Sequence, residues 1–297
     1  MPVGSNLISR RSLVAGAGLI LASPLQAAAE PHPPQQLTVG LLPGETAATV
    51  LRLNEPLRAY LERRLGIPVK LIVGTNYAAT GEALHYGKLD IAYLGPVTYI
   101  LRSRGANLEP FARPSHPGAG PTFHAVVIVP ADSPAKSLKD LKGQDIAFGD
   151  PASTSGTWVP RYMLLEAGLV SGRDYPLRVL GAHDAVARAV AAKKVGAGGL
   201  SKPVYERLLK EEIIPENSVR VLGESPDIPE YMWTFRQGLD PAFKEKIRTA
   251  FLQIDDPEAL KVFKAEAFIP AADGDVAVVR GWIEAIRAAN PDAVPKT

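Results

Sequence analysis

A chain of 297 residues with 46% hydrophobic side chains is long enough for two domains of ordinary size, each with a buried core. Its 33 basic and 31 acidic residues nearly balance, which argues against nucleic acid or an anionic membrane surface as a partner. The absence of cysteine excludes disulfides, thiolate metal sites, cysteine nucleophiles and a lipid-modified N-terminal cysteine.

The N-terminal 29 residues have the pattern of an export signal. Arg10 and Arg11 form a twin-arginine pair, followed by an apolar run at 13–25 and a small-residue cleavage site at 27–29. The run is too short to span, as a helix, a hydrocarbon layer of roughly 30 Å, which argues against a membrane anchor. Leu13 stands where twin-arginine signals commonly have an aromatic residue, so ordinary secretion stays open. We expect a cleaved signal and a mature protein in the periplasm.

Short apolar runs alternate with helical spacings along residues 37–224. In the first half we expect strands at 37–42, 69–73 and 90–94, helices at 51–65 and 78–86, and a helix opening at Gly95-Pro96. In the second half we expect strands at 125–129, 145–148, 177–180, 195–200 and 219–222, with helices beginning near 137, 157, 184 and 203. From Pro241 the pattern is helical throughout, in three pieces divided at Pro257 and Pro270. Such alternation is typical of parallel βαβ units.

This order predicts an α/β protein with two lobes that the chain crosses twice, near 123–129 and 225–235. The C-terminal helices have no sheet of their own, so we expect them to pack back on the first lobe. The predicted division is residues 1–29 as signal, 30–36 as a proline-rich linker, 37–124 with 233–297 as lobe 1, and 125–232 as lobe 2. A cleft between two lobes is the natural place for a ligand.

The most informative segment is a run of three hydroxyl side chains. Ser153, Thr154 and Ser155 follow a predicted strand and open a helix, with Gly156 directly after them. A helix start has unpaired backbone N–H groups and the positive end of the helix dipole, so hydroxyls beside it can cradle a tetrahedral oxyanion. A helix cap rich in Ser and Thr is the structural alternative. A Walker-type loop is excluded because the Gly-Lys-[Ser/Thr] ending is missing.

Other candidates stand at the ends of neighbouring strands. His183 follows a strand of the second lobe and can donate to a phosphoryl oxygen. In the first lobe, Tyr77 and Tyr93 follow or end a strand, and Gly95 opens a second helix whose N–H groups can face the ligand. In an open α/β sheet these positions face one cleft. A capping histidine and core tyrosines are the alternatives.

Two stretches of sequence together resemble one family. Gly-Lys-Leu-Asp-Ile-Ala-Tyr-Leu-Gly-Pro at 87–96 and Phe-Gly-Asp-Pro-Ala-Ser-Thr-Ser-Gly at 148–156 are similar to segments of the periplasmic phosphate-, phosphite- and phosphonate-binding proteins of ABC importers. Gly-Ala-His at 181–183 strengthens the match, which covers most of residues 37–240. The resemblance implies the type II periplasmic-binding-protein fold, a clamshell that closes on a small phosphorus oxyanion, with an ABC permease in the inner membrane as partner.

The resemblance also implies roles for individual residues. Ser153, Thr154, Ser155 and His183 would hold the phosphoryl oxygens, and Tyr77 would form a wall of the pocket. The complete predicted ligand-binding set adds Gly156, Tyr93, Gly95, Phe123 and Tyr231. We expect no catalytic residue, no cofactor and a monomer.

The sequence departs from the aminoethylphosphonate-binding members, in which acidic residues of the second lobe and second crossover hold the ligand's ammonium. The corresponding stretches here, 200–203 and 228–231, place no carboxylate at either position, although Glu230 is one residue away. Near the first crossover, Phe123 and His124 stand where an aromatic residue with a hydroxyl is usual. A buried, unpaired ammonium costs several kcal/mol. The departures therefore favour phosphite, phosphate or a small alkylphosphonate.

Two other interpretations stay open. Ser153 or Ser155 with His183 could act as nucleophile and base, but no Gly-x-Ser-x-Gly elbow surrounds the serines, and we expect no enzyme. The same fold could bind a non-phosphorus molecule such as a pyrimidine or an organic acid, or present its ligand to a membrane sensor kinase. The chain has only five histidines, and His32 and His116 lie in loop-like stretches, so we expect no metal cluster.

Overall fold

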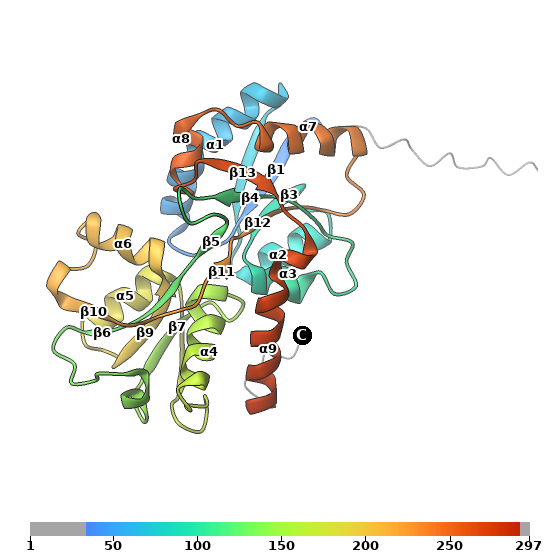
Figure 1. Cartoon of the computed structure of the whole chain (residues 1–297). Coiled ribbons are helices and arrows are strands. Elements are labelled where there is room, and N and C mark those ends of the chain that lie inside the picture. Colours follow the sequence, from blue (N-terminus) through green and yellow to red (C-terminus); the bar gives the residue numbers. More distant parts are fainter. Residues whose placement is uncertain (1–33, 292–297) are drawn as a thin grey trace, which may run out of the picture. The chain divides into compact units, whose positions relative to one another are not determined.

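The computed structural model describes residues 34–291 and contains two large sheets with helices on their faces (Figure 1). The predicted signal at 1–29, the linker up to residue 33 and residues 292–297 lie outside the described part. Within that part, no helix is both long and apolar enough to cross a membrane.

The six-stranded sheet, here called the sheet of lobe 1, has the strand order β13-β4-β12-β3-β1-β2. β1 is parallel to β2 and β3, whereas β12 is antiparallel to β3 and β4, and β13 is antiparallel to β4. Its strands are β1 (Leu37–Leu41), β2 (Val69–Val73), β3 (Ile91–Leu94), β4 (Glu109–Ser115), β12 (Met232–Phe235) and β13 (Ala267–Pro270).

Helices cover both faces of this sheet. α1 (Ala47–Leu65), α7 (Pro241–Leu252) and α8 (Pro257–Lys261) share one apolar core with alternate residues of β1 and β3. On the other face lie α2 (Tyr77–His85) and α3 (Pro96–Arg102), whose apolar residues belong to a second core. Pro96 occupies the first turn of α3, where its missing N–H costs no hydrogen bond.

The five-stranded sheet, the sheet of lobe 2, has the order β10-β6-β9-β7-β8. β7 is parallel to β8 and β9, and β6 is antiparallel to β9 and β10. Its strands are β6 (Ala125–Pro130), β7 (Ile146–Gly149), β8 (Leu177–Gly181), β9 (Ala197–Ser201) and β10 (Val219–Glu224). Its helices and helical turns are η1 (Leu138–Leu141), η2 (Thr154–Trp158), α4 (Val159–Glu166), α5 (His183–Ala191), α6 (Lys202–Lys210) and η3 (Glu216–Ser218).

Two short strands connect the lobes. β5 (Thr122–Phe123) and β11 (Ile228–Pro229) form an antiparallel pair in which Phe123 stands opposite Ile228. Each leads from one sheet to the other, since β5 lies between β4 and β6 and β11 lies between β10 and β12. A two-stranded link of this size is suited to act as a hinge.

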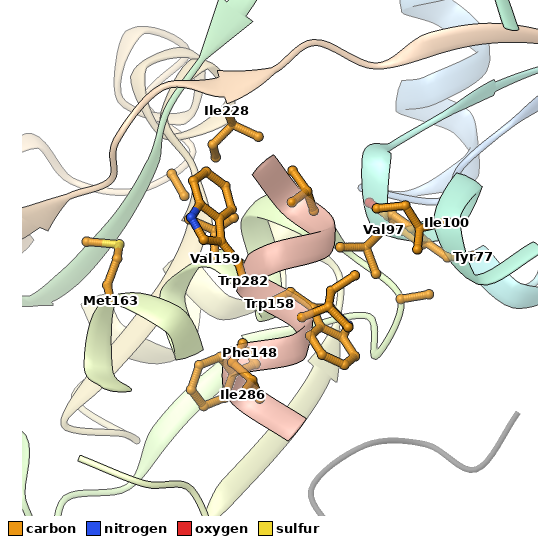
Figure 2. Packing of buried hydrophobic residues seen from close by; sticks show 14 of the residues in the cluster. Tyr77, Val97, Ile100, Phe148, Trp158, Val159, Met163, Ile228, Trp282 and Ile286 are labelled. Atoms are coloured by element: carbon orange, nitrogen blue, oxygen red, sulfur yellow. The ribbon is translucent and has the colours of Figure 1, made fainter. Parts of the chain in front are cut away.

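The C-terminal segment η4 (Asp273–Val276) and α9 (Ala277–Ala289) follows β13. α9 contacts both α3 and α4, and the ring of Trp282 stacks on that of Tyr162 at 5.3 Å between centroids. Figure 2 shows Trp282 and Ile286 of α9 in the same cluster as Trp158 and Val97. This core therefore joins elements of both lobes.

The structure corrects two expectations. The segment from Pro241 onward is not helical throughout, because residues 267–270 form β13 and complete the sheet of lobe 1. The sheets are mixed and not purely parallel. In lobe 1, β12 pairs antiparallel with β3 and β4, and neither β4 nor β12 was expected as a strand. β12 and β13 each carry large apolar residues in a run of four, which periodicity alone does not distinguish from a helix segment. The remaining predicted strands and helices are present within a few residues of their expected bounds.

Candidate functional site

The three consecutive hydroxyls lie on a π-helical turn, η2, directly after β7. The N–H of Trp158 donates to the carbonyl oxygen of Ser153 at 3.1 Å, five residues back, and α4 continues the turn. The side chains of Ser153, Thr154 and Ser155 are completely buried. Single π-helical turns recur at functional sites, and this one places all three side chains between the two lobes.

The three hydroxyls have different partners. Ser153 Oγ accepts the N–H of Gly156 at 3.1 Å and so caps the turn. Thr154 Oγ1 accepts the N–H of Val97 at 3.0 Å, and Val97 belongs to α3 of lobe 1. Ser155 Oγ is buried and makes no well-formed hydrogen bond among the described residues, although the Tyr231 hydroxyl lies beside it. Because Ser153 and Thr154 only accept in these bonds, all three hydroxyls keep an O–H that can donate to a ligand, and Ser155 is the least committed of the three.

Two tyrosines bring their hydroxyls to the same place. Burial raises the pKa of Tyr77 well above its usual value and raises the pKa of Tyr231 to about 12. Interactions with Ser155, Tyr77 and Ser153 partly oppose the shift at Tyr231, which places its hydroxyl beside the serines. Both tyrosines stay protonated at neutral pH and can donate hydrogen bonds.

His183 begins α5 and its ring is buried against the serine turn. Nδ1 accepts the N–H of Ser201 at 3.3 Å, so the proton of the neutral ring is on Nε2. Burial lowers the pKa of His183 to about 4, which keeps the ring neutral in ordinary conditions. A Cβ added to Gly156 would lie 2.9 Å from the His183 ring, so the close approach requires glycine.

Glycines of lobe 1 close the site from the other side. A Cβ on Gly44 would lie 3.1 Å from the Tyr77 hydroxyl oxygen and 3.9 Å from Nε2 of His183. A Cβ on Gly95 would lie 2.8 Å from the ring of Tyr231. The Nε2–H of His183 and the Tyr77 hydroxyl thus meet over Gly44, while the Tyr231 ring lies over Gly95.

Two other predicted residues have different positions. Phe123 contacts the ring of Tyr231 edge-on, with centroids 5.7 Å apart, and so borders the site. Tyr93 also contacts the ring of Tyr231, with centroids 5.3 Å apart, but its ring stacks on Trp233 at 4.9 Å and its hydroxyl donates to Glu230 at 3.3 Å. Burial raises the pKa of Tyr93 well above its usual value.

Sequence analysis missed the role of Asp150. Its Oδ1 accepts the N–H of Ala152 at 2.7 Å and its Oδ2 accepts the N–H of Tyr77 at 3.1 Å, which ties the serine turn to α2. Thr157 Oγ1 also donates to the carbonyl oxygen of Asp150 at 2.8 Å. An aspartate that bonds a main-chain N–H two residues on is a common turn device, and this was the available signal.

The donors gathered here are uncharged. They are the hydroxyls of Ser155, Tyr77 and Tyr231 and the Nε2–H of His183. Such a set suits a tetrahedral oxyanion, because each oxygen can accept from a neutral donor in a water-poor site. Within residues 34–291, no group of three or more acidic or histidine side chains is arranged to hold a metal ion.

Comparisons with known proteins point to one family. A family model described as "ABC transporter, phosphonate, periplasmic substrate-binding protein" matches residues 39–276. The chain is 28% identical over 249 residues to the phosphonates-binding periplasmic protein of Escherichia coli, with 82% of this chain and 74% of that protein covered. It is 26% identical over 260 residues to the phosphate-import protein PhnD of Mycolicibacterium smegmatis, with 84% and 80% covered.

The fold has a close match among solved structures. A binding protein component of an ABC phosphonate transporter from Pseudomonas aeruginosa superimposes with a TM-score of 0.79 at 23% identity, covering 88% of this chain and 89% of that one. This similarity confirms the two-lobed type II periplasmic-binding-protein fold expected from the sequence.

Proposed function

Since this chain belongs to the family of periplasmic substrate-binding proteins of phosphonate ABC transporters, we propose that it captures a small phosphorus oxyanion without an amine and delivers it to an ABC permease. Phosphite, phosphate and a small alkylphosphonate are the ligands considered. The observation that carries this proposal is the Ser155 hydroxyl, which is buried beside Tyr231 and makes no well-formed hydrogen bond within the described part of the chain. A polar group left in that state costs about 1–3 kcal/mol, and an oxyanion oxygen would remove the cost.

The neighbouring donors support a tetrahedral ligand. The hydroxyls of Tyr77 and Tyr231 stay protonated, and the neutral ring of His183 carries its proton on Nε2. We propose that these groups, with Ser155 and the main chain of the serine turn, each bind one phosphoryl oxygen. Thr154 acts differently in this proposal, because its side chain accepts from Val97 and so links the lobes beside the ligand.

We infer that the ligand has no amine from the two stretches at 200–203 and 228–231. Ser201 donates its N–H to His183, and Tyr231 places its hydroxyl beside the serines, so neither contributes a charge. An ammonium buried next to these groups would lack a counter-ion, which costs several kcal/mol. The names of the relatives include both phosphonate and phosphate as ligands, since one is a phosphonates-binding protein and another is a phosphate-import protein.

We also propose that residues 1–29 direct export and are removed, so that the mature protein works as a monomer in the periplasm. Support comes from the twin-arginine pair, the apolar run and the small residues before Glu30. Whether the twin-arginine or the general secretory route is used is tested by replacing Arg10 and Arg11 with lysine, which blocks only twin-arginine export.

Calorimetric titration of residues 30–297 tests the ligand directly. Phosphate, phosphite, methylphosphonate and 2-aminoethylphosphonate are the probes, and we expect tight binding of at least one of the first three and the weakest binding for the amine. Binding to none of the four would remove the phosphorus oxyanion as ligand. Preferential binding of 2-aminoethylphosphonate would contradict the proposal that the ligand has no amine.

A further inference from the structure

Glu230 is a buried carboxylate next to the site whose two oxygens are both occupied. Oε1 lies 2.9 Å from Nε2 of His116. Oε2 accepts the main-chain N–H of Tyr231 at 2.8 Å and the hydroxyl of Tyr93 at 3.3 Å. The side chain of Glu230 is only 9% exposed, so these partners replace most of its hydration.

His116 is positively charged where it contacts the Glu230 carboxylate. Its Nδ1 lies 3.2 Å from the carbonyl oxygen of Lys264, and its Nε2 faces the Glu230 carboxylate. Both partners can only accept hydrogen bonds, so both ring nitrogens must donate and the ring is an imidazolium. Accordingly, the hydrogen bond to Glu230 raises the pKa of His116 above its usual value. The pair is therefore a neutral unit built from two opposite charges.

Glu230 adjoins the ligand site through Tyr231. The main-chain N–H of Tyr231 bonds the carboxylate, while its ring lies over Gly95 with the hydroxyl beside Ser155. The negative charge of Glu230 acts on the Tyr231 hydroxyl, since it raises the pKa of that group. A net charge at Glu230 would thus act on a ligand held by Tyr231.

Two other carboxylates near the site are also committed. Asp150 is bonded to the main-chain N–H groups of Tyr77 and Ala152. Glu45, which follows Gly44, forms an ion pair with Arg207 of α6. Of these three carboxylates, Glu230 is the one whose charge is balanced by a histidine, and histidine, unlike arginine, can lose its charge near neutral pH.

We infer that His116 determines ligand specificity, because its pairing with Glu230 withholds from the site a carboxylate that would otherwise favour ligands carrying an ammonium group. This inference rests on the proposed function and deepens it. With His116 uncharged or removed, Glu230 keeps a net negative charge beside Tyr231. That charge repels the phosphonate of any ligand equally, but it attracts only a ligand with an ammonium, so the ratio of the two affinities shifts.

The experiment measures this ratio. Dissociation constants of methylphosphonate and 2-aminoethylphosphonate are determined at pH 7 for the wild type, His116→Ala and His116→Gln. We expect the ratio to shift at least about tenfold toward the amine in both variants, since one uncompensated charge at a short distance acts on the ammonium. His85→Ala, at a histidine on α2 whose ring contacts Tyr86, is the matched control and should leave the ratio unchanged.

A second substitution isolates Glu230. In the double variant His116→Ala with Glu230→Gln the shift should disappear, because no carboxylate remains to be exposed. If the His116 variants do not fold, the wild type is titrated from pH 6 to 9. The ratio should then move toward the amine as His116 loses its proton, once each affinity is corrected for the ligand's own second phosphonate ionisation, which the ammonium shifts to lower pH in 2-aminoethylphosphonate. The charged groups around His116 are Glu230 and Lys264, whose ammonium pairs with Glu206.

The outcomes distinguish a failure of the role of His116 from a failure of the proposed function. A folded His116→Ala protein that binds methylphosphonate with an unchanged ratio overturns the role of His116 and leaves the proposed function intact. A wild type that binds neither methylphosphonate nor phosphite nor phosphate overturns the proposed function, and the inference with it.

Discussion

The main-chain N–H of His183 donates to the carbonyl oxygen of Gly44 at 2.9 Å, which joins the start of α5 in lobe 2 to the loop after β1 in lobe 1. Two further bonds of this kind run from the N–H groups of Tyr77 and Val97 to Asp150 and Thr154. These three bonds between the lobes involve residues that form the oxyanion site or stand beside it. Ligand binding and lobe closure must be coupled, since both need the same elements in the same positions.

Ser155→Ala should separate binding from stability. Because Ser155 Oγ is buried and makes no well-formed hydrogen bond with any described residue, its removal should leave the free energy of unfolding of the ligand-free protein unchanged or slightly higher. Binding of the phosphorus ligand should weaken by about 1–3 kcal/mol, since one oxyanion oxygen loses its donor. Calorimetry and urea denaturation measure the two quantities.

Ser153→Ala is the matched comparison. Ser153 Oγ caps the turn through the N–H of Gly156, so its loss should lower the free energy of unfolding by about 1 kcal/mol. If Ser155→Ala destabilised the protein as much as Ser153→Ala and left affinity untouched, the assignment of Ser155 as a ligand donor would be wrong.

Gly95→Ala should prevent closure without preventing folding. The new Cβ would lie 2.8 Å from the ring of Tyr231 and 3.2 Å from Oγ1 of Thr154, which belong to the crossover segment and to lobe 2. Each lobe can still form its own sheet, but the closed arrangement must shift. We expect at least a roughly tenfold weaker affinity, since overpacking typically costs 1–3 kcal/mol.

Gly281→Ala controls for the substitution itself. Gly281 lies on α9 with open space around the position of a Cβ, so alanine should leave affinity unchanged and stabilise the helix by up to about 1 kcal/mol. Equal affinities for the two glycine variants would contradict a closed site at Gly95.

The stability of the protein should fall in acid because of His183. Its pKa of about 4 in the folded protein is below the usual 6.5, so unfolding takes up a proton between pH 6.5 and pH 4. The loss of stability is zero above pH 6.5, grows as the pH falls from 6.5 through 4, and reaches about 3 kcal/mol once the pH is below 4.

The difference between the wild type and His183→Asn isolates this effect from other titrating groups. Urea denaturation at pH 7.5, 5.5 and 4 should show the difference shrinking as the pH falls. The Hε1 resonance of His183 should stay at its neutral position down to pH 5 in the wild type. A resonance that titrates near pH 6.5 would show that the ring is not buried as described.

Trp282→Ala should destabilise the protein strongly. Trp282 stacks on Tyr162 of α4 and packs in the core that joins the lobes, as Figure 2 shows. Truncating a buried aromatic side chain costs about 3–5 kcal/mol. Val278→Ala, at a position 46% exposed on the same helix, should cost less than about 0.5 kcal/mol. Similar losses for both variants in urea denaturation would place α9 outside the core.

Much of the fold was predictable because its signals are local. Strand β2 and helix α3 were expected from β-branched residues and from Gly95-Pro96, which act within a few positions of the chain. β12 and β13 were not expected, because what makes them strands is pairing with β3 and β4, far away in the sequence. Their own residues do not distinguish a short buried strand from a helix segment.

The same division applies to the site. The run Ser153-Thr154-Ser155 after a strand indicated an oxyanion cradle, since a helix start exposes its N–H groups wherever it occurs. The sequence did not distinguish the roles of the three hydroxyls. Only the tertiary structure turns Thr154 to Val97 and leaves Ser155 without a well-formed hydrogen bond among residues 34–291.

By itself, then, the sequence determined the family, the alternation of elements and the position of the serine turn, because these depend on neighbours along the chain. The tertiary structure decided which polar groups meet. Tyr77 and Asp150 are 73 residues apart, and His116 and Glu230 are 114 residues apart. Contacts over such separations depend on the order of strands in two sheets and on the crossovers between them, and no local pattern encodes that order.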